Sequence, residues 1–213
     1  MEFCLFGAGG HARDLLGQIA AEPDRGRCLC LVDDFAPGGD RDGVAVLSLD
    51  AAVAAFPGAL WLIAVGRPRD RAAVAARLAA LGLAEGRYVS ARCHVAPDAE
   101  IGPGVQVFAG TSISAGVRLG RGAIVNFNGS LSHDVVLGEF VTVSPGATLA
   151  GRVTVGDGVF IGAGATIAPR RLGSAITIGA GATVGAGATV LDSVAPGATV
   201  VGTPARPIGE PPC

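Results

Sequence analysis

Long hydrophobic runs, aromatic side chains and an excess of charge of either sign are all scarce in this sequence of 213 residues. No apolar stretch reaches the roughly 18 residues that a membrane-spanning helix needs, so we expect no contact with the membrane interior. The net charge is −2, which gives no basis for a surface that binds nucleic acid or an anionic membrane, because such a surface needs clustered positive charge. Only 5% of the residues are aromatic whereas glycine occurs 34 times, which favours an architecture of regular tight turns.

Cysteines are few and irregularly spaced. The five are Cys4, Cys28, Cys30, Cys93 and Cys213, an odd number without the spacing of a zinc site or a redox pair. We expect buried free thiols, with Cys28 and Cys30 on the same face of one strand. Free thiols, and a start that lacks the basic region of a signal peptide, predict a cytoplasmic protein.

Residues 1–88 alternate between short strands and helices. Strands are predicted over 3–6, 28–32 and 60–65, and helices over 12–21, 51–56 and 69–81. Because strands that alternate with helices form parallel sheets, we predict a small Rossmann-like βαβ domain. The segment is too short for a complete dinucleotide-binding domain, which argues against hydride transfer.

We predict a second domain over residues 89–213, in which the chain follows a different period, of six residues, from Val95 onward. Thirteen branched aliphatic residues occupy this register without a break from Val95 to Ile167, and glycine-containing pairs lie between them. A hexapeptide period is the signature of a parallel β-helix, with one short strand and one corner per repeat. Three repeats make a triangular coil, so residues 18 apart lie above one another. An extra loop interrupts the register over 168–177.

Two neighbouring corners depart from this pattern. His133 and Asp134 occupy positions where other corners carry Pro-Gly or Ala-Gly, and Asn128 lies on the corner before. Corner side chains point outward, so His133 is free to take a proton from an attacking group, and the carboxylate beside it can orient the imidazole. Asp134 and Asn128 also tolerate a left-handed backbone best after glycine, so a purely conformational reason for them stays open.

A glycine-rich turn separates the first strand from the first helix. Its Gly9, Gly10 and His11 present a helix N-terminus that suits phosphate, although a merely tight turn explains them equally well. The next strand ends in Asp33-Asp34 and the third in Gly66. Three strand ends therefore converge on one crevice, where ligands of parallel sheets bind.

Together these features resemble the family of sialic acid O-acetyltransferases and bacillosamine N-acetyltransferases, which are left-handed β-helix enzymes. The resemblance covers essentially the whole chain and rests on Phe6-Gly-Ala-Gly-Gly-His11, Val32-Asp-Asp-Phe35, Ile63-Ala-Val-Gly66, Asn126, Ser132-His-Asp134, Leu137-Gly-Glu-Phe140 and Val201-Gly-Thr-Pro-Ala-Arg206. It implies left-handed coiling, a homotrimer with active sites between subunits, and acetyl-CoA bound between adjacent prisms. No metal is implied, since only His133 lies within the repeat.

The resemblance also implies roles for individual residues. His133 matches the general base and Asp134 the acidic residue beside it, where relatives often carry Glu. Positions that hold the nucleotide-sugar fall at Gly9, Gly10, His11, Asp33, Asp34, Gly66 and Asn126. Coenzyme A positions fall at Thr142, Ala163 and Ala180, and Thr142 replaces a histidine found in some relatives.

The implied reaction is N-acetylation of a nucleotide-linked amino sugar, such as a UDP-, GDP- or dTDP-linked 4-amino-4,6-dideoxy sugar, in polysaccharide biosynthesis. We expect direct transfer, because no cysteine lies in the repeat between Val95 and Val201. Gly151 lies one coil beyond His133, so its N–H is a candidate to stabilise the oxyanion beside the coenzyme. Two other interpretations are O-acetylation of a sialic acid or another sugar, and a non-catalytic β-helix scaffold.

Overall fold

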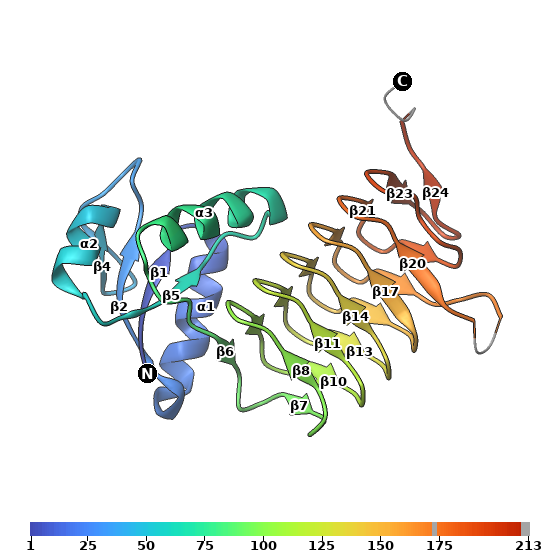
Figure 1. Cartoon of the computed structure of the whole chain (residues 1–213), viewed down its shortest axis with the longest axis horizontal. Coiled ribbons are helices and arrows are strands. Elements are labelled where there is room, and N and C mark those ends of the chain that lie inside the picture. The colour runs from blue at the N-terminus through green and yellow to red at the C-terminus, as the bar shows by residue number, and fades with distance from the viewer. Residues whose placement is uncertain (172–173, 210–213) are drawn as a thin grey trace.

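The structure is a computed structural model that describes residues 1–171 and 174–209. A small α/β domain lies at one end of a long triangular prism of stacked coils (Figure 1). This arrangement confirms the Rossmann-like domain and the β-helix that the two sequence periods predict. No helix in the described ranges is long and apolar enough to cross a membrane.

The N-terminal domain is built on a five-stranded sheet of order β3-β4-β2-β1-β5. Its strands are β1 (Glu2–Phe6), β2 (Arg27–Val32), β3 (Asp40–Arg41), β4 (Val44–Leu47) and β5 (Leu60–Ile63), and only β3 is antiparallel. The helices are α1 (Gly10–Ala21), α2 (Leu49–Ala55) and α3 (Pro68–Ala80), with a short 3₁₀ turn at Pro23–Arg25. Helix α1 packs on one face of the sheet, and α2 and α3 pack on the other. The β3–β4 hairpin is an element that the sequence patterns do not predict.

Local chemistry explains where two of the helices begin. Helix α2 starts two residues earlier than predicted because the Ser48 hydroxyl accepts a hydrogen bond from the Ala51 N–H at 3.3 Å. Helix α3 starts at Pro68, whose fixed φ suits the first helical position. Helix α1 has Gly9 at its N-cap and no side-chain cap, so its first N–H groups keep their hydrogen-bonding capacity.

The cysteines of β1 and β2 are free thiols, but two of them lie differently from the prediction. Phe3 pairs with Cys28 whereas Cys4 pairs with Cys30, so a bulge inserts one residue into β2. Cys28 therefore packs on the α1 side of the sheet and Cys30 on the α2–α3 side. The prediction that they share one face is wrong, because the bulge breaks the alternation of side chains. Cys213 lies outside the described residues.

The prism has three parallel sheets, which we number I to III. Sheet I contains β6 (Tyr88–Val89), β9 (Gln106–Val107), β12 (Ile124–Val125), β15 (Thr142–Val143), β18 (Phe160–Ile161), β21 (Thr183–Val184) and β23 (Thr199–Val201), closed by the antiparallel β24 (Arg206–Pro207). Sheet II contains β7 (His94–Val95), β10 (Ser112–Ile113), β13 (Ser130–Leu131), β16 (Thr148–Leu149), β19 (Thr166–Ile167) and β22 (Thr189–Val190). Sheet III contains β8 (Glu100–Ile101), β11 (Arg118–Leu119), β14 (Val136–Leu137), β17 (Val153–Val155) and β20 (Ile176–Ile178).

Residues 18 apart pair across neighbouring coils, as the period predicts. Ile113 pairs with Leu131, and Leu131 pairs with Leu149, which stacks buried aliphatic side chains along the prism axis. The loop inserted after Ile167 lengthens one coil, so that Thr166 pairs with Thr189. This continuous apolar column is the main core of the prism.

The corners of the coils form three edges, which we name by one residue each. The His133 edge comprises residues 115–116, 133–134, 151–152 and 169–170, the Phe127 edge 109–110, 127–128, 145–146 and 163–164, and the Phe140 edge 121–122, 139–140, 157–158 and 180–181. Most corners turn on a glycine with positive φ, but Asn128, Asp134, Phe140 and Arg152 take this conformation with a side chain. Asn128 and Asp134, on the two corners that the sequence singles out, are thus two of these four exceptions.

A buried arginine joins the two domains. Arg71 of α3 is fully buried, and its Nε donates to the Gly122 carbonyl on the Phe140 edge at 2.8 Å. Its Nη1 donates to the Val65 and Gly66 carbonyls, and its Nη2 to the Phe140 carbonyl and the Thr142 hydroxyl. Burial lowers the pKa of Arg71 to about 10, which leaves it charged at neutral pH. These contacts fix the α/β domain on sheet I.

A buried carboxylate, that of Glu22 at the C-terminal end of α1, makes a second tie between the two domains. Glu22 is 8% exposed and accepts hydrogen bonds from the Tyr88 hydroxyl, the Ser90 hydroxyl, the Ala91 N–H and Arg92. Burial disfavours its ionised form, yet these four donors together hold the pKa of Glu22 below its usual 4.5. The chain that leads into the first coil is thereby held against α1.

Candidate active site

His133 and Asp134 form a hydrogen-bonded pair on the edge of the prism. The His133 Nδ1 lies 2.9 Å from the Asp134 Oδ2, and about half of each side chain is exposed. The buried neighbours Leu131 and Val135 anchor this corner in the core, so both polar side chains point outward. An ionised carboxylate can only accept, so the pair holds the imidazole proton on Nδ1 and leaves Nε2 free to accept a proton.

The coil beyond His133 is shaped to receive its ring. A β-carbon added to Gly151 would lie 2.4 Å from the His133 Nε2, so only glycine permits this approach. The Arg152 N–H donates to the His133 carbonyl at 3.0 Å, which locks the two coils together. In the described part of the chain, no residue accepts a hydrogen bond from the Gly151 N–H, so this donor is available on the coil against which the His133 ring packs.

A pocket of about 570 Å³ opens beside this pair. Its lining combines the His133 edge with the loop inserted after Ile167 and consists of His133, Ala150, Gly151, Arg152, Ala168, Pro169, Arg170 and Ser174. Arg170 is held in place by an ion pair with Asp192 at 2.8 Å. The His133 edge is therefore hollowed at this point, and Arg152 and Arg170 lie along the pocket.

The N-terminal domain has its own crevice where three strands end. A cavity of about 690 Å³ is lined by Phe6, Gly7, Ala8, Val32, Asp33, Asp34, Phe35, Val65, Ala73, Val74 and Arg77. Gly7 has a φ of 120°, and a β-carbon there would lie 2.6 Å from the Ala64 carbonyl oxygen, so the turn needs glycine. The predicted convergence of the ends of β1, β2 and β5 is confirmed.

The two aspartates of this crevice are partly engaged in shaping it. The Asp33 Oδ1 accepts hydrogen bonds from the N–H groups of Phe35 and Ala36, at 3.0 and 3.2 Å. Burial disfavours the charged form of Asp34, but the Leu49 N–H and the ion pair with Arg77 hold its pKa below the usual value. Asp34 thus stays ionised, and Phe35 stands fully exposed at the rim.

In the glycine turn, Gly9 and Gly10 are open to solvent, whereas His11 faces the prism. Nothing lies within 4 Å of the position of a β-carbon on Gly9 or Gly10, so a ligand has room over the N-terminus of α1. The His11 ring instead packs on Phe108, with 5.3 Å between ring centroids, and its Nε2 lies 3.0 Å from the Gln106 Oε1. His11 is therefore placed at the junction of the two domains.

The positions expected to hold coenzyme A do not come together within one chain. Thr142 is 5% exposed at the domain junction, where its hydroxyl donates to the Gly66 carbonyl at 2.8 Å and accepts from Arg71. Gly151 lies on the His133 edge, Ala163 on the Phe127 edge and Ala180 on the Phe140 edge. In this chain, the hydroxyl of Thr142 is occupied in joining the domains.

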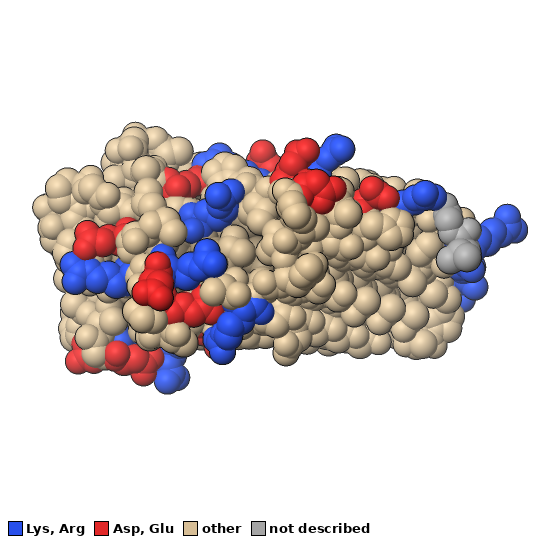
Figure 2. Space-filling model, turned by 90° about the horizontal axis from the view of Figure 1, so that it is seen from below, with Lys and Arg blue, Asp and Glu red and all other residues tan. Residues whose placement is uncertain are grey.

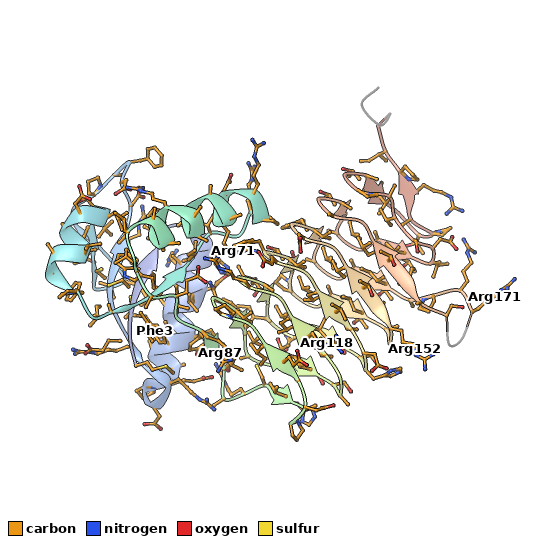
Figure 3. All side chains as sticks on the ribbon, in the orientation of Figure 1. Phe3, Arg71, Arg87, Arg118, Arg152 and Arg171 are labelled. Atoms are coloured by element: carbon orange, nitrogen blue, oxygen red, sulfur yellow. The ribbon has the colours of Figure 1, made fainter. Side chains whose placement is uncertain are left out.

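The two halves of the site are also far apart in the fold. Each coil passes from the His133 edge along sheet III to the Phe140 edge, then along sheet I to the Phe127 edge. Sheet I carries the N-terminal domain, so the His133 edge is the vertex opposite that domain. Figure 3 shows this separation, with Arg71 where the domain meets the coils and Arg152 on the far edge. Asn126 directly precedes the Phe127 edge, and its Oδ1 accepts a hydrogen bond from the Phe127 N–H at 2.8 Å.

Three contacts at the junction of the domains and coils are not predicted from the sequence. Arg71 lies among several arginines of α3, and its only signal is that it shares the helical spacing of the buried Ala75 and Leu78. Gln106 reads as an ordinary outward position of a coil, yet it is fully buried. Phe108 and Phe127, on neighbouring coils, meet edge to face with 5.0 Å between their ring centroids. The six-residue period gives the coil of each residue but does not predict this contact.

Comparisons with known proteins agree with this geometry. The model of the bacterial transferase hexapeptide (six repeats) family matches residues 134–169. The acetyltransferase domain of PglB from Neisseria gonorrhoeae, solved with acetyl coenzyme A, is 33% identical, with a TM-score of 0.87 and coverage of 97% of this chain and 98% of that one. A search of curated protein sequences finds no match.

Two further solved structures are similar over almost their full length. A histidine-to-asparagine mutant of perosamine N-acetyltransferase from Caulobacter crescentus, in complex with CoA and GDP-perosamine, is 29% identical, with a TM-score of 0.90 and coverage of 99% and 98%. WeeI from Acinetobacter baumannii is 28% identical, with a TM-score of 0.90 and coverage of 98% and 100%. The chain therefore belongs to the left-handed β-helix acetyltransferases of the hexapeptide-repeat family, as the resemblance in its sequence predicts.

Proposed function

We propose that this protein transfers the acetyl group of acetyl-CoA to the amine of a nucleotide-linked amino sugar. The observation that carries the proposal is the His133–Asp134 pair, whose imidazole packs so closely on Gly151 that a β-carbon there would lie 2.4 Å from the free Nε2. Residues 1–88 would bind the nucleotide-sugar, and residues 89–213 would bind the coenzyme. The solved relatives with acetyl coenzyme A, and with CoA and GDP-perosamine, support both substrates.

The chemistry follows from the protonation of the pair. Asp134 holds the proton on Nδ1, so Nε2 of His133 removes a proton from the sugar amine as its lone pair attacks the thioester carbonyl. The N–H of Gly151 donates to the oxygen that becomes negative in the tetrahedral intermediate. Collapse of the intermediate breaks the C–S bond, and the imidazolium returns its proton to the departing thiolate. The products are the N-acetylated sugar and CoA, and the base is regenerated.

The pocket on the His133 edge suits the coenzyme. Arg152 and Arg170 line it and can donate hydrogen bonds to phosphate oxygens, with Arg170 oriented by its ion pair with Asp192. Ala163 and Ala180 are small corner residues further along the prism, where a long thin ligand needs room. We therefore assign Gly151, Ala163 and Ala180 as residues that contact the coenzyme.

A complete active site requires two chains. His133 lies on the vertex opposite the N-terminal domain of its own chain, whereas His11 and Phe108 lie on the side of the Phe127 edge. We therefore propose that the His133 edge of one chain meets the crevice and Phe127 edge of a neighbour, in a homotrimer. Gly9, Gly10, His11, Asp33, Asp34, Gly66 and Asn126 of the neighbour would then hold the nucleotide-sugar.

The surface of the prism is compatible with close packing of copies. Arg, Asp and Glu gather over the N-terminal domain in Figure 2, while much of the prism surface in that view carries none of them. Outward positions of sheet II are small and uncharged after His94, namely Ser112, Ser130, Thr148, Thr166 and Thr189. A neighbouring prism can approach such a face without burying a charge.

Hybrid trimers test the shared site. His133→Ala removes the base, and Gly9→Trp fills the open space over the helix N-terminus; each variant alone should be inactive. Mixed trimers made by co-expression contain some sites with an intact base from one chain and an intact crevice from the other. We expect partial activity to return in the mixture. A mixture as inactive as the two parents would show that each site lies within one chain.

The acceptor is expected to be an amine. The relative solved with GDP-perosamine is named an N-acetyltransferase, which favours N-acetylation over the O-acetylation of sialic acid. We further propose that the protein acts in the cytoplasm, where free thiols such as those of Cys4, Cys28, Cys30 and Cys93 stay reduced. Release of CoA with a panel of UDP-, GDP- and dTDP-linked 4-amino sugars and free sialic acid decides between the acceptors.

A further inference from the structure

The orientation of one buried amide determines which nitrogen of His11 carries its proton. Gln106 is fully buried between the domains, and its Nε2 donates to the Ile63 carbonyl at 2.9 Å. A carbonyl oxygen can only accept, so the amide nitrogen must face Ile63 and the amide oxygen must face His11. The His11 Nε2, 3.0 Å from that oxygen, is therefore the protonated nitrogen.

The other ring nitrogen is left as an acceptor. Nδ1 of His11 has no hydrogen-bond partner among the described residues. Since no buried side-chain nitrogen or oxygen in the described ranges lacks a partner, Nδ1 is in contact with solvent. Burial and the nearby Arg71 lower the pKa of His11, while Gln106 and Asp14 oppose them, which favours the neutral ring at pH 7.

The position of this acceptor limits what it can bind. His11 directly follows Gly9 and Gly10, and its ring packs on Phe108, which in turn contacts Phe127. It thus lies between the open glycine turn, where we propose that the phosphates bind, and the Phe127 edge, where we propose that a neighbour's His133 lies. A bare nitrogen lone pair attracts O–H or N–H donors and repels the oxygen atoms of a phosphate.

We infer that Gln106 is a positioning residue that holds His11 as the Nε2–H tautomer, so that Nδ1 accepts a hydrogen bond from a hydroxyl or amine of the sugar. This inference rests on the proposed function and assigns His11 to the sugar rather than to the pyrophosphate. It also gives Gln106, which the sequence pattern does not single out, a role in substrate selection.

Histidine-selective NMR reads the tautomer directly. The sequence contains only His11, His94 and His133, so ¹⁵N-histidine labelling with His94→Gln and His133→Gln for assignment gives three resolved rings. We expect the wild-type His11 to carry its proton on Nε2 at pH 7, without any ligand. A proton on Nδ1, or a doubly protonated ring, would overturn the inference whatever the enzyme acetylates.

Kinetics with Gln106→Leu then separate positioning from general stability. We expect a mixed His11 tautomer and a KM for the amino-sugar nucleotide that rises roughly tenfold, as expected for one hydrogen bond, with KM for acetyl-CoA unchanged. Gln18→Leu is the matched control, because Gln18 is buried at the same junction and accepts from the Ala109 N–H at 2.9 Å. An unchanged tautomer in Gln106→Leu, or equal rises in both KM values, contradicts the inference.

Ligand titration distinguishes sugar from phosphate. UDP and GDP alone should leave the Nδ1 signal of His11 in place, whereas the UDP- or GDP-linked 4-amino sugar should shift it. A shift with the free nucleotide would assign His11 to the phosphates and overturn the inference. If no amino sugar in the panel is acetylated, the proposed function fails, while the tautomer of the free protein still decides the role of Gln106.

Discussion

The imidazole of His133 lies against the α-carbon of Gly151 so closely that a β-carbon on Gly151 would stand 2.4 Å from Nε2. Gly151 belongs to the next coil, 18 residues further along the chain. The absence of one side chain thus sets the position of the base, and the same residue offers the N–H proposed to stabilise the oxyanion.

Replacing Gly151 by alanine should displace His133. The added methyl group forces the imidazole of His133 out of its present position in the pocket and strains its hydrogen bond to Asp134. We expect kcat to fall at least about a hundredfold, the usual contribution of a positioned base, measured as CoA release. Gly17→Ala is the control, because a β-carbon there meets open space and alanine favours helix α1. Full activity in Gly151→Ala would refute the assigned position of the base.

Two substitutions of Asp134 separate its conformational role from its catalytic role. Asp134 has a φ of 60°, which glycine adopts freely and asparagine tolerates. If conformation alone explains the residue, Asp134→Gly should be fully active. We expect instead that Asp134→Gly and Asp134→Asn both fold with near wild-type stability and lose roughly tenfold or more in kcat. Thermal unfolding and steady-state kinetics on the same samples make the comparison.

The domain junction should depend strongly on Arg71. Replacing Arg71 by leucine leaves several buried carbonyl oxygens without a donor, so we expect a loss of about 3 kcal/mol or more in the free energy of unfolding. Arg71→Lys keeps the charge but lacks the planar set of donors, and it should recover only part of the loss. Chemical denaturation measures both variants. Stability of Arg71→Leu within 0.5 kcal/mol of wild type, roughly the scatter of neutral surface substitutions, would contradict the role of the junction.

The fold is readable from the sequence because its signals are repetitive. Each inward aliphatic such as Leu131 recurs every six residues, and the strand–helix alternation before it is equally regular. His133 and Asp134 could be found because they interrupt that regularity. The β3–β4 hairpin and the bulge that separates Cys28 from Cys30 could not, because both depend on pairing with a neighbouring strand.

The contacts between the two domains could not be predicted from the sequence either. Gln106 and Thr142 occupy outward positions of their coils, which the period marks as exposed, but the N-terminal domain covers both. Whether His11 faces a ligand or the prism depends on how the two domains dock. That docking rests on Arg71 and Glu22, single polar residues without a sequence pattern of their own.

Stability should depend on pH through Glu22. Because the folded-state pKa of Glu22 is depressed, its contribution is present above the usual 4.5 and is lost as pH falls through the lower folded value. Glu22→Gln should therefore unfold more easily at pH 7, by about 1.5–3 kcal/mol, with the difference from wild type narrowing below pH 4.5. Glu2→Gln, which breaks the exposed pair with Arg27, is the control and should change little. A difference that stays constant down to acid pH would contradict this role.

The release of CoA from acetyl-CoA in the presence of UDP-, GDP- and dTDP-linked 4-amino sugars, compared between wild type and His133→Ala, tests the central claim most directly. We predict rapid release with at least one amino-sugar nucleotide, none with free sialic acid, and a loss of roughly a hundredfold to ten-thousandfold in the variant. Release of CoA with sialic acid alone would show that the acceptor is a hydroxyl rather than an amine. Wild-type rates in His133→Ala, or no release with any acceptor, would contradict the assignment of His133 as the base.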